Sequence, residues 1–411
     1  PPTSRTPGTG KSTTLIEAVE QFASQKKRVL MSAPSNAAVD HLVKSIPAKY
    51  NVLRVGNLSK AAPEINHRTI EGNWASSGLD KTVKKLKIRA EEMRKMSRQY
   101  KRKFGYEERN QRRLLMQEVK NIRKEIKDLR NSTENKWIEN ADVIVGTPIA
   151  LYDLTLDYHS FDVVMLDEAG QCLEPLMWSI APLGKKLILA GDPFQLPPTV
   201  LSKKAENMAL GVSALERCFE LDFPKMLLKT QYRMPPELMA FSNSYFYSDE
   251  LEAFKPSAKD SIAFYDTTGT EAEETRLDGS SSLCNPEEIE FIKKFVSNKG
   301  WEPKTTCIIS PYSAQVSELR NRLGKEWKVS TIDSFQGQEE EQIILSLVRN
   351  NRNNEIGFLK DYRRMNVALT RAKKKMVVFG DSTTLASDPF YGQFLDNIES
   401  IGAYHSCWEL M

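Results

Sequence analysis

Short apolar runs rich in β-branched residues alternate along this chain with stretches of helical periodicity, and polar clusters follow many of the runs. This alternation is typical of α/β folds, in which helices connect parallel strands. We interpret as strands the runs at residues 29–33, 143–145, 163–166, 187–189, 262–265, 307–309, 329–332, 343–348 and 376–379. Open parallel sheets bind ligands beyond the carboxyl ends of their strands. The sequence therefore predicts two sheets and a site shared between two domains.

The length of the chain limits the number of such domains. Its 411 residues and 46.7 kDa fit two or three domains of roughly 100 to 200 residues each. A connection that contains proline, at residues 223–228, separates the two groups of apolar runs. We therefore expect one α/β domain over residues 1–225 and a second over residues 226–411.

The composition excludes several classes of protein. Apolar residues make up 40% of the chain and charged residues 27%, as in ordinary globular proteins. The longest apolar runs fall far short of the roughly 20 residues that a membrane helix needs. Residues 1–6 lack the apolar core of a signal peptide, and the five cysteines form no Cys-x-x-Cys pair. We expect an intracellular monomer of the cytoplasm, the nucleus or both, with no membrane partner and no structural zinc.

Residues 81–130 concentrate positive charge. They hold 19 Lys and Arg against 7 Asp and Glu, an excess of +12 where the whole chain has +4. Apolar residues recur there at spacings of three and four, with one gap at Ser97: Val83, Leu86, Ala90, Met93, Tyr100, Leu115, Val119, Ile122, Ile126 and Leu129. The pattern predicts an antiparallel helical hairpin, inserted at about residues 78–135 and turning at residues 103–106. Its charge indicates a solvated face, a nucleic-acid surface or an arm for a protein partner.

The strongest local motif is the sequence Pro-Gly-Thr-Gly-Lys-Ser-Thr-Thr at residues 7–14, which precedes a helical run. It resembles a Walker A phosphate loop, in which backbone N–H groups and a helix N-terminus surround phosphates. Lys11 would contact the β- and γ-phosphates of a nucleotide, and Ser12 would be a ligand of Mg²⁺. The other loop residues that would bind the nucleotide are Gly8, Thr9, Gly10 and Thr13.

Two features depart from that motif. Arg5 stands where a phosphate loop has its first glycine, and residues 1–4 read Pro-Pro-Thr-Ser where an apolar strand should lead into the loop. We therefore expect this leading strand to be missing or altered. A clamp or scaffold that binds nucleic acid with weak or no hydrolysis is the alternative function that these departures favour.

Two apolar runs end in side chains suited to phosphate chemistry. The run at residues 163–166 is followed by Asp167 and Glu168, as in a Walker B motif. Asp167 would hold Mg²⁺, and Glu168 would accept a proton from the attacking water. The run at residues 187–189 leads into a Gly/Pro-rich turn whose Gln195 would sense the γ-phosphate. Taken alone, either feature is also compatible with a strand-end cap or a simple turn.

Two arginines lie in polar motifs of the second half. Arg233 belongs to Gln-Tyr-Arg-Met at residues 231–234, and Arg371 belongs to Asn-Val-Ala-Leu-Thr-Arg-Ala at residues 366–372. Arginines from a second domain can stabilise charge on a transferring phosphoryl group. The full set favours a nucleotide hydrolase, because a P-loop kinase of small metabolites would leave the second-half motifs unexplained.

In order, these motifs resemble those of superfamily 1 nucleic-acid helicases. The branch is the one that contains the nonsense-mediated-decay helicase, senataxin and the immunoglobulin mu-binding helicase, and the hairpin and residues 357–366 are most similar to the last of these. The motifs that carry the resemblance lie at residues 33–40, 167–171, 191–198, 231–234, 310–312, 330–339 and 366–372. The resemblance implies two RecA-like P-loop domains, ATP with Mg²⁺, and 5′ to 3′ movement on single-stranded RNA or DNA that unwinds duplexes or remodels nucleoprotein complexes.

The resemblance also implies residue roles. Gln195, Arg233 and Arg371 would act on the γ-phosphate. The remaining nucleotide contacts would be Tyr232, stacked on adenine, and Gly337 and Glu339 near the ribose. In this family an adenine-reading glutamine segment, a β-barrel and a stalk precede the phosphate loop, and we expect this chain to lack them.

Small polar residues and prolines at strand ends are the candidates for contact with nucleic acid. Ser35 and Asn36 precede a helical run, where N–H groups can receive a phosphate, although helix capping favours the same residues. In the family such positions follow one strand across both domains, and here they are Pro34, Ser35, Asn36, Thr147, Pro148, Pro311, Tyr312, Thr331 and Ser334. Backbone contacts of this kind predict sequence-tolerant binding and do not choose between RNA and DNA.

Overall fold

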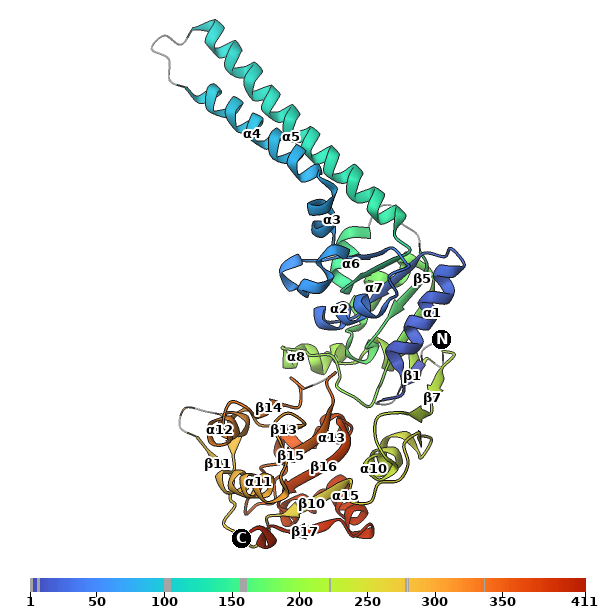
Figure 1. Ribbon diagram of the computed structural model, residues 1–411, viewed down its shortest axis with the longest axis vertical. Coiled ribbons are helices and arrows are strands. Elements are labelled where there is room, and N and C mark those ends of the chain that lie inside the picture. The colour runs from blue at the N-terminus through green and yellow to red at the C-terminus, as the bar shows by residue number, and fades with distance from the viewer. Residues whose placement is uncertain are drawn as a thin grey trace. The chain divides into compact units, whose positions relative to one another are not determined.

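A computed structural model describes residues 3–5, 8–99, 105–155, 161–221, 223–277, 279, 281–335 and 337–411 of the protein (Figure 1). The chain divides into two compact units. The hairpin unit comprises residues 12–190, and the arginine unit comprises residues 1–11 and 191–411. The domain boundary expected near residue 225 stays a prediction.

The hairpin unit contains five parallel strands in the order β3-β4-β2-β5-β6. Their bounds are β2 Val29–Ser32, β3 Val52–Arg54, β4 Val143–Gly146, β5 Phe161–Leu166 and β6 Gly184–Gly191. The four strands that were expected in this unit are confirmed. Strand β3 was not expected, because Arg54 interrupts its short apolar run.

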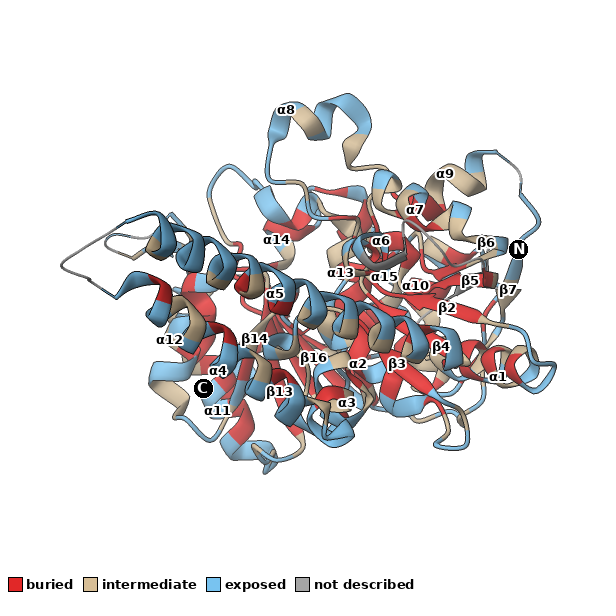
Figure 2. Cartoon of the chain, turned by 90° about the horizontal axis from the view of Figure 1, so that it is seen from above, coloured by how far each residue is buried: buried red, intermediate tan, exposed pale blue. Residues whose placement is uncertain are grey.

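Helices α1 and α2 supply much of the core of this unit. The helices that connect its strands are α1 Lys11–Ser24, α2 Asn36–Ser45, α6 Pro148–Thr155 and α7 Glu174–Ile180. Leu15 and Val19 of α1, and Leu42 of α2, are buried with the strand residues in one core cluster. Each such aliphatic side chain contributes roughly 1.5–3 kcal/mol when fully buried. Figure 2 shows the central strands as buried and the outer helix surfaces as exposed.

The predicted helical hairpin is present. Helices α4 (Leu79–Arg98) and α5 (Tyr106–Asn140) lie side by side and extend away from the sheet of their own unit (Figure 1). The buried side chains of the predicted apolar seam are Val83, Ala90, Val119 and Ile122. Helix α5 begins at Tyr106, the last residue of the predicted turn, and continues beyond the expected end near residue 135. Tyr100 and residues 103–104 of the predicted turn lie outside the described residues.

Ser97, the polar residue that interrupts the apolar spacing, is itself part of the seam. Ser97 is buried, and its hydroxyl donates to the carbonyl oxygen of Arg94 at 2.8 Å and lies 3.4 Å from the sulfur of Met116. A small side chain that satisfies its own hydroxyl group can therefore continue an apolar seam. This explains why the two helices remain packed across a position that the spacing left open.

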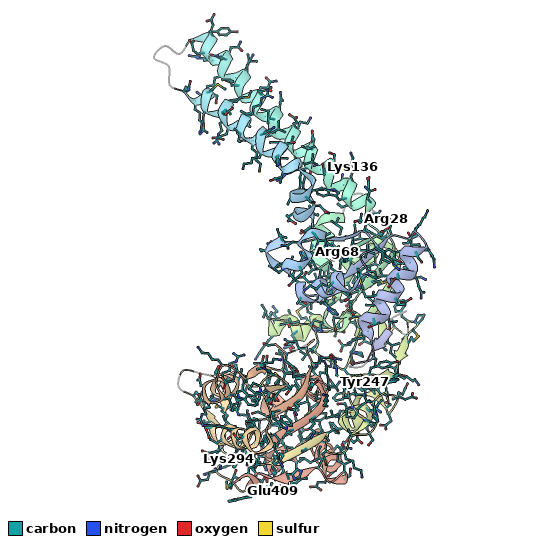
Figure 3. All side chains as sticks on the ribbon, in the orientation of Figure 1. Arg28, Arg68, Lys136, Tyr247, Lys294 and Glu409 are labelled. Carbon is teal, nitrogen blue, oxygen red and sulfur yellow. The ribbon has the colours of Figure 1, made fainter. Side chains whose placement is uncertain are left out.

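The base of the hairpin is fixed to the rest of its unit. Trp74, on helix α3 (Ile70–Ser77), packs edge to face on Trp137 with ring centroids 5.3 Å apart and donates to Glu134 at 2.9 Å. Arg28, labelled in Figure 3, donates to the carbonyl oxygen of Ile138 at 2.9 Å. Most of the surface of α4 and α5 beyond this base is exposed (Figure 2).

The arginine unit contains six parallel strands in the order β14-β13-β15-β16-β10-β17. Their bounds are β10 Ile262–Asp266, β13 Thr306–Ser310, β14 Lys328–Thr331, β15 Glu340–Ser346, β16 Ala372–Gly380 and β17 Tyr404–Ser406. Five of them are the strands expected from the sequence. Strand β17 was not expected, because its three residues are half-buried and carry no apolar run.

Helices and short strand pairs complete this unit. The helices are α8 Lys203–Ala205, α9 Ala214–Glu220, α10 Pro236–Tyr247, α11 Pro286–Lys299, α12 Ser313–Leu323, α13 Tyr362–Leu369, α14 Ser382–Leu385 and α15 Pro389–Ser400. The short strands are β7 Met226–Leu228, β8 Thr230–Gln231, β9 Glu252–Ala253, β11 Thr275–Arg276 and β12 Leu283–Cys284. Two core clusters form around the sheet, one of them rich in aromatic rings from α10 and α15. No helix among the described residues is long and apolar enough to cross a membrane.

A strand does lead into the phosphate loop, so of the two alternatives expected, a missing or an altered strand, the altered, polar strand is the one present. Strand β1 (Thr3–Arg5) pairs in parallel with β7, with Ser4 opposite Leu227. A strand at this position needs only an extended backbone that exchanges hydrogen bonds with a neighbour, so a polar sequence can form it. The side chain of Arg5, which stands where a phosphate loop has its first glycine, lies outside the described part of the chain.

Candidate nucleotide site and nucleic-acid interface

The phosphate loop turns on two glycines with left-handed backbone. Gly8 has a φ of 76° and Gly10 a φ of 75°, a region that glycine enters without steric cost. A Cβ atom on Gly8 would lie 2.5 Å from the Cβ of Arg233, so a larger residue would displace that arginine. The carbonyl oxygen of Gly8 accepts a hydrogen bond from the N–H of Tyr232 at 2.9 Å. The loop therefore packs directly on the segment that carries two predicted site residues.

Tyr232 offers an aromatic surface beside the loop. Its side chain is 53% exposed, and its ring lies 4.9 Å from that of Phe254, which is 70% exposed. Exposed rings of this kind provide faces on which a base can stack. Phe254 was not predicted, because it belongs to no recognisable motif and reaches Tyr232 through the pairing of β8 with β9.

The first turn of α1 places Ser12 beside an acidic strand end. The helix begins at Lys11, so Ser12 and the exposed Thr13 lie where helix N–H groups and dipole favour an anion. The Ser12 hydroxyl donates to Oδ2 of Asp167 at 3.3 Å. Asp167 follows β5, is 4% exposed, and donates its own N–H to the carbonyl oxygen of Ser32 at 2.8 Å.

Glu168, the residue after Asp167, has an unusual backbone conformation. Its φ is 51°, in the left-handed region that few non-glycine residues adopt outside turns and functional sites. Its N–H donates to Oδ1 of Asp167 at 3.0 Å, while its carboxylate accepts from the Gln171 amide at 3.0 Å. The two neighbouring carboxylates thus face different partners, which suits separate roles as metal ligand and proton acceptor.

The donors around Ser12 fit a magnesium ion that is bound together with a nucleotide. Mg²⁺ prefers oxygen ligands, often one or two carboxylates with phosphates and waters. Ser12 and Asp167 bring one hydroxyl and one carboxylate together. Across the described ranges, no group of three or more His, Cys, Asp or Glu gathers as a metal cage. This donor set suits a cation that phosphate oxygens help to hold.

Gln195 lies between an acid and an arginine in the arginine unit. Its Nε2 donates to Oδ2 of Asp192 at 2.8 Å, and its Oε1 accepts from Nη2 of Arg371 at 3.1 Å. All three side chains are buried. Burial raises the pKa of the Asp192 carboxyl, and the positive charge of Lys11 opposes that shift. The fold thus brings together Gln195 and Arg371, two residues predicted from separate motifs.

Arg233 is oriented by a second set of acceptors. It donates to Oε2 of Glu339 at 2.8 Å and to the carbonyl oxygen of Thr370 at 2.6 Å. Glu339 also pairs with Lys373 at 2.8 Å. Burial raises the pKa of Glu339, but Lys373 and Arg233 outweigh it and the net pKa is lowered. Gly337 has a φ of 77°, and no atom lies within 4 Å of a Cβ built on it.

The candidate nucleic-acid residues of the hairpin unit share one edge of its sheet. Strands β2 and β4 are neighbours, with Ser32 opposite Gly146, so the segments that follow them lie side by side. Ser35 caps α2 and accepts from the N–H of Ala38 at 3.2 Å, while Thr147 accepts from the N–H of Ala150 at 3.4 Å. Both hydroxyl groups therefore have capping roles in this structure. Pro34 is half-buried and Pro148 is buried at the start of α6.

Arg54 orients Asn36 and was missed by the sequence analysis. It is 1% exposed and donates to Oδ1 of Asn36 at 3.0 Å, to Oδ1 of Asp40 at 3.2 Å and to the carbonyl oxygen of Asn57 at 3.2 Å. The first of these bonds engages the amide oxygen of Asn36. The signal available in the sequence was a lone charged residue inside the apolar run at residues 52–55.

In the arginine unit, the predicted nucleic-acid residues follow two paired strands. Ser310 of β13 lies opposite Thr331 of β14. The Thr331 hydroxyl accepts from the N–H of the exposed Ser334 at 3.2 Å and donates to its hydroxyl at 2.9 Å. Tyr312, next to the half-buried Pro311, is 7% exposed, so its ring is part of the core beside Phe358. Any contact made at Tyr312 would use its backbone.

Most of the predicted site residues thus form small groups, each within one of the two units. Ser12, Asp167 and Glu168 lie together in the hairpin unit. Gln195 joins Arg371, and Arg233 joins Glu339 and the phosphate loop, in the arginine unit. The assignment of these residues to a nucleotide stays a prediction.

Two family models match the chain, one over residues 2–203 and the other over residues 210–383, and both are described as an AAA domain. Together they cover nearly all of the chain. Their order agrees with the division of the sequence motifs between the two halves.

Three relatives illustrate the similarity. DNA-binding protein SMUBP-2 of Rattus norvegicus is 31% identical over 438 residues, which cover 98% of this chain and 43% of the rat protein. An uncharacterized ATP-dependent helicase of Methanocaldococcus jannaschii is 32% identical, over 97% of this chain and 68% of that protein. The regulator of nonsense transcripts 1 homolog of Arabidopsis thaliana is 32% identical, over 98% of this chain and 32% of its own length. The chain therefore spans less than half of the rat and plant relatives.

Proposed function

This chain belongs to the superfamily 1 helicases of the branch that contains the nonsense-mediated-decay helicase, senataxin and the immunoglobulin mu-binding helicase, and from that premise we propose that it is an ATP-driven motor on single-stranded nucleic acid. The observation that carries the proposal is the placement of Ser12 against the buried Asp167, with Glu168 held separately beside them. This arrangement divides phosphate chemistry between a metal-binding pair and a proton acceptor.

The hydrolytic step uses residues of the phosphate loop and of the strand end after β5. Lys11 and the first turn of α1 bind the phosphates of ATP and orient the γ-phosphate. Ser12 and Asp167 would hold Mg²⁺, which when bound neutralises charge on the phosphate oxygens. Glu168 would take a proton from the attacking water. Its carboxylate accepts from the Gln171 amide, while its N–H donates to Asp167.

Arg233, Arg371 and Gln195 are proposed to act on the charge that develops at the γ-phosphate. Each guanidinium group is held by several hydrogen bonds, Arg371 by the carbonyl oxygens of Val367 and Gln338 as well as by Gln195. Donors oriented in advance stabilise developing charge without reorganising during the reaction. All three residues belong to the arginine unit.

The strand-end residues of both sheets are proposed to hold the backbone of RNA or DNA. Small hydroxyl groups and helix N-termini follow β2, β4, β13 and β14. Such groups contact phosphates and sugars, so binding is expected to tolerate any sequence. Movement from 5′ to 3′ is the direction that the family resemblance implies for this chain.

The deciding experiment is steady-state ATPase with no nucleic acid, with single-stranded RNA and with single-stranded DNA. Glu168→Gln serves as the blank, since it should bind ATP but not turn it over. Stimulation by either strand supports the motor, and the ratio of the two rates indicates its substrate. ATP and strand binding without turnover would instead favour the clamp or scaffold, and stimulation that survives in Glu168→Gln would contradict the site assignment.

A further inference from the structure

Tyr247 joins two of the predicted site motifs although it belongs to neither. It is the last residue of α10 and is labelled in Figure 3. Its hydroxyl lies 2.9 Å from Oδ2 of Asp192 and 2.8 Å from Nδ2 of Asn366. Asp192 precedes Gln195 in one motif, and Asn366 precedes Arg371 in the other. A single buried oxygen atom therefore connects two segments that are far apart in sequence.

The direction of these hydrogen bonds follows from the chemistry of the partners. The Asn366 NH₂ group is only a donor, and it also donates to the carbonyl oxygen of Phe194 at 2.9 Å. The Tyr247 oxygen must therefore accept from Asn366, and its single proton is left for the Asp192 carboxylate. That carboxylate oxygen also accepts from Nε2 of Gln195 at 2.8 Å. The resulting chain runs from Asn366 through Tyr247 and Asp192 to Gln195.

The Tyr247 ring fixes the same turn by packing. Tyr247 is 6% exposed, and its ring meets that of Phe194 edge to face, with centroids 5.4 Å apart and planes at 85°. The N–H of Phe194 donates to Oδ1 of Asp192 at 3.0 Å. Both oxygens of Asp192 are therefore engaged, and the turn that carries Gln195 is held by ring contact on one side and by hydrogen bonds on the other.

We propose that Tyr247 is a positioning residue that acts through Asp192 to fix the amide of Gln195 against Arg371. The Gln195 amide has two distinguishable ends, and the hydrogen bond from Nε2 to Asp192 leaves Oε1 directed at Nη2 of Arg371. If Asp192 turned, Gln195 would lose the partner that determines which end faces the arginine. This inference rests on the proposed ATPase and adds to it a residue that lies outside the motifs predicted to contact the nucleotide.

A second observation supports a network that is specialised rather than merely structural. Asn366 is fully buried, and its Oδ1 has no hydrogen-bond partner in the structure, although buried polar atoms are nearly always paired. A reversed amide would place that oxygen against the Phe194 carbonyl oxygen, so the assigned orientation is the favourable one. In this orientation the Asn366 NH₂ group donates to both Tyr247 and the Phe194 carbonyl oxygen, while the amide oxygen is left without a partner.

The test is Tyr247→Phe, which removes the hydroxyl and retains the ring contact with Phe194. We expect the nucleic-acid-stimulated kcat for ATP to fall about tenfold with KM changed less than twofold, because a hydrogen bond to a charged group is lost where geometry matters for the reaction. Tyr391→Phe is the matched control. Tyr391 is also buried, but its hydroxyl donates to the carbonyl oxygen of Leu359 at 2.9 Å, outside this chain of hydrogen bonds.

A double-mutant cycle separates positioning from a general loss of stability. If Tyr247 acts through Gln195, then Tyr247→Phe should change kcat less than twofold in a Gln195→Ala background. A structural role would give the same loss of kcat in both backgrounds. That result, or a kcat equal to that of the Tyr391→Phe control, would overturn the proposal.

The outcomes also separate this inference from the proposed function. A wild-type chain without stimulated ATPase would defeat the proposed function and the inference together, whereas an active wild type with an unaffected Tyr247→Phe would defeat the inference alone. If Tyr247→Phe does not fold, Asp192→Asn tests the same connection from its other end. It should also lower kcat and lose most of its effect in the Gln195→Ala background.

Discussion

The hairpin and the network around Asp192 carry charged groups in opposite ways. On α4 and α5 most basic side chains are exposed, and the apolar contact between the helices is a narrow seam. Asp192, Gln195 and Arg371 are buried and engage one another directly. Exposed charges act through a field that salt screens, whereas buried polar groups act through fixed geometry. Changes to the two regions should therefore differ in size and in salt dependence.

The largest effect is expected for Glu168→Gln. Loss of the proton acceptor should lower stimulated ATPase by about 10³-fold, within the range for removal of a general base, while ATP binding is retained. Steady-state kinetics and nucleotide titration measure the two properties. Glu174→Gln, a half-buried glutamate that accepts from the Trp178 side chain, is the control and should stay within twofold of wild type. Equal rates for the two variants would remove Glu168 from the mechanism.

Arg371→Lys should have the next largest effect. The Arg371 guanidinium donates to Val367, Gln338 and Gln195, and a lysine ammonium on a flexible stem cannot reproduce that planar pattern. We expect kcat to fall about 10²-fold. Arg322→Lys, which alters an arginine paired with Glu318 and Glu290 at the surface, should leave kcat within twofold. A small loss of kcat in Arg371→Lys would show that a positive charge at this position is sufficient and that the planar guanidinium group is not needed.

A buried carboxyl group makes stability depend on pH. Glu288 accepts hydrogen bonds from the Ser346 hydroxyl and the Val348 N–H, and burial raises its pKa from 4.5 to about 8. Between these values the folded state keeps a proton that the unfolded state releases. The free energy of unfolding should therefore fall as pH rises from about 4.5 to 8, by at most ~1.4 kcal/mol per pH unit, and level off above. Urea titrations of wild type and Glu288→Gln measure this slope, which the variant should lack.

The smallest effect is expected for the exposed lysines of the hairpin. Replacing Lys84, Lys85 and Lys87 with alanine should weaken binding of single-stranded RNA about tenfold at low salt and reduce the salt slope by about 2. The control replaces three exposed lysines of α11, Lys293, Lys294 and Lys299. Fluorescence anisotropy over a salt series measures both quantities. An unchanged affinity and slope would assign the hairpin to a protein partner or to spacing.

Much of the fold was predictable because it depends on local pattern. The expected strands and the hairpin seam follow from the spacing of apolar residues, a pattern that can be recognised within a short segment without knowledge of its partners in the fold. The strands that escaped prediction are those whose residues are polar or few. Strand β1 forms from Thr-Ser-Arg because β7 pairs with it, and β3 accommodates Arg54 because Asn36 and Asp40 accept its hydrogen bonds.

The candidate site was predictable where one motif carries one role. Ser12 and Asp167 were assigned from separate motifs, and the fold places them in contact. Tyr247 could not be found in this way, since a tyrosine at a helix end has no distinctive spacing and its two partners come from other segments. The burial of Tyr312 could not be predicted either, because its position after a strand does not show that its ring packs beside Phe358.

The length of α5 has a mechanical consequence. A helix of 35 residues is about 50 Å long, and α5 is held at one end through Trp137 and Ile138. A tilt of about 10° at that base would displace the far end by roughly 9 Å, given the same helix length. Because of this length, small changes of angle near Arg28 and Trp74 would produce large displacements of the basic surface at the far end of the hairpin.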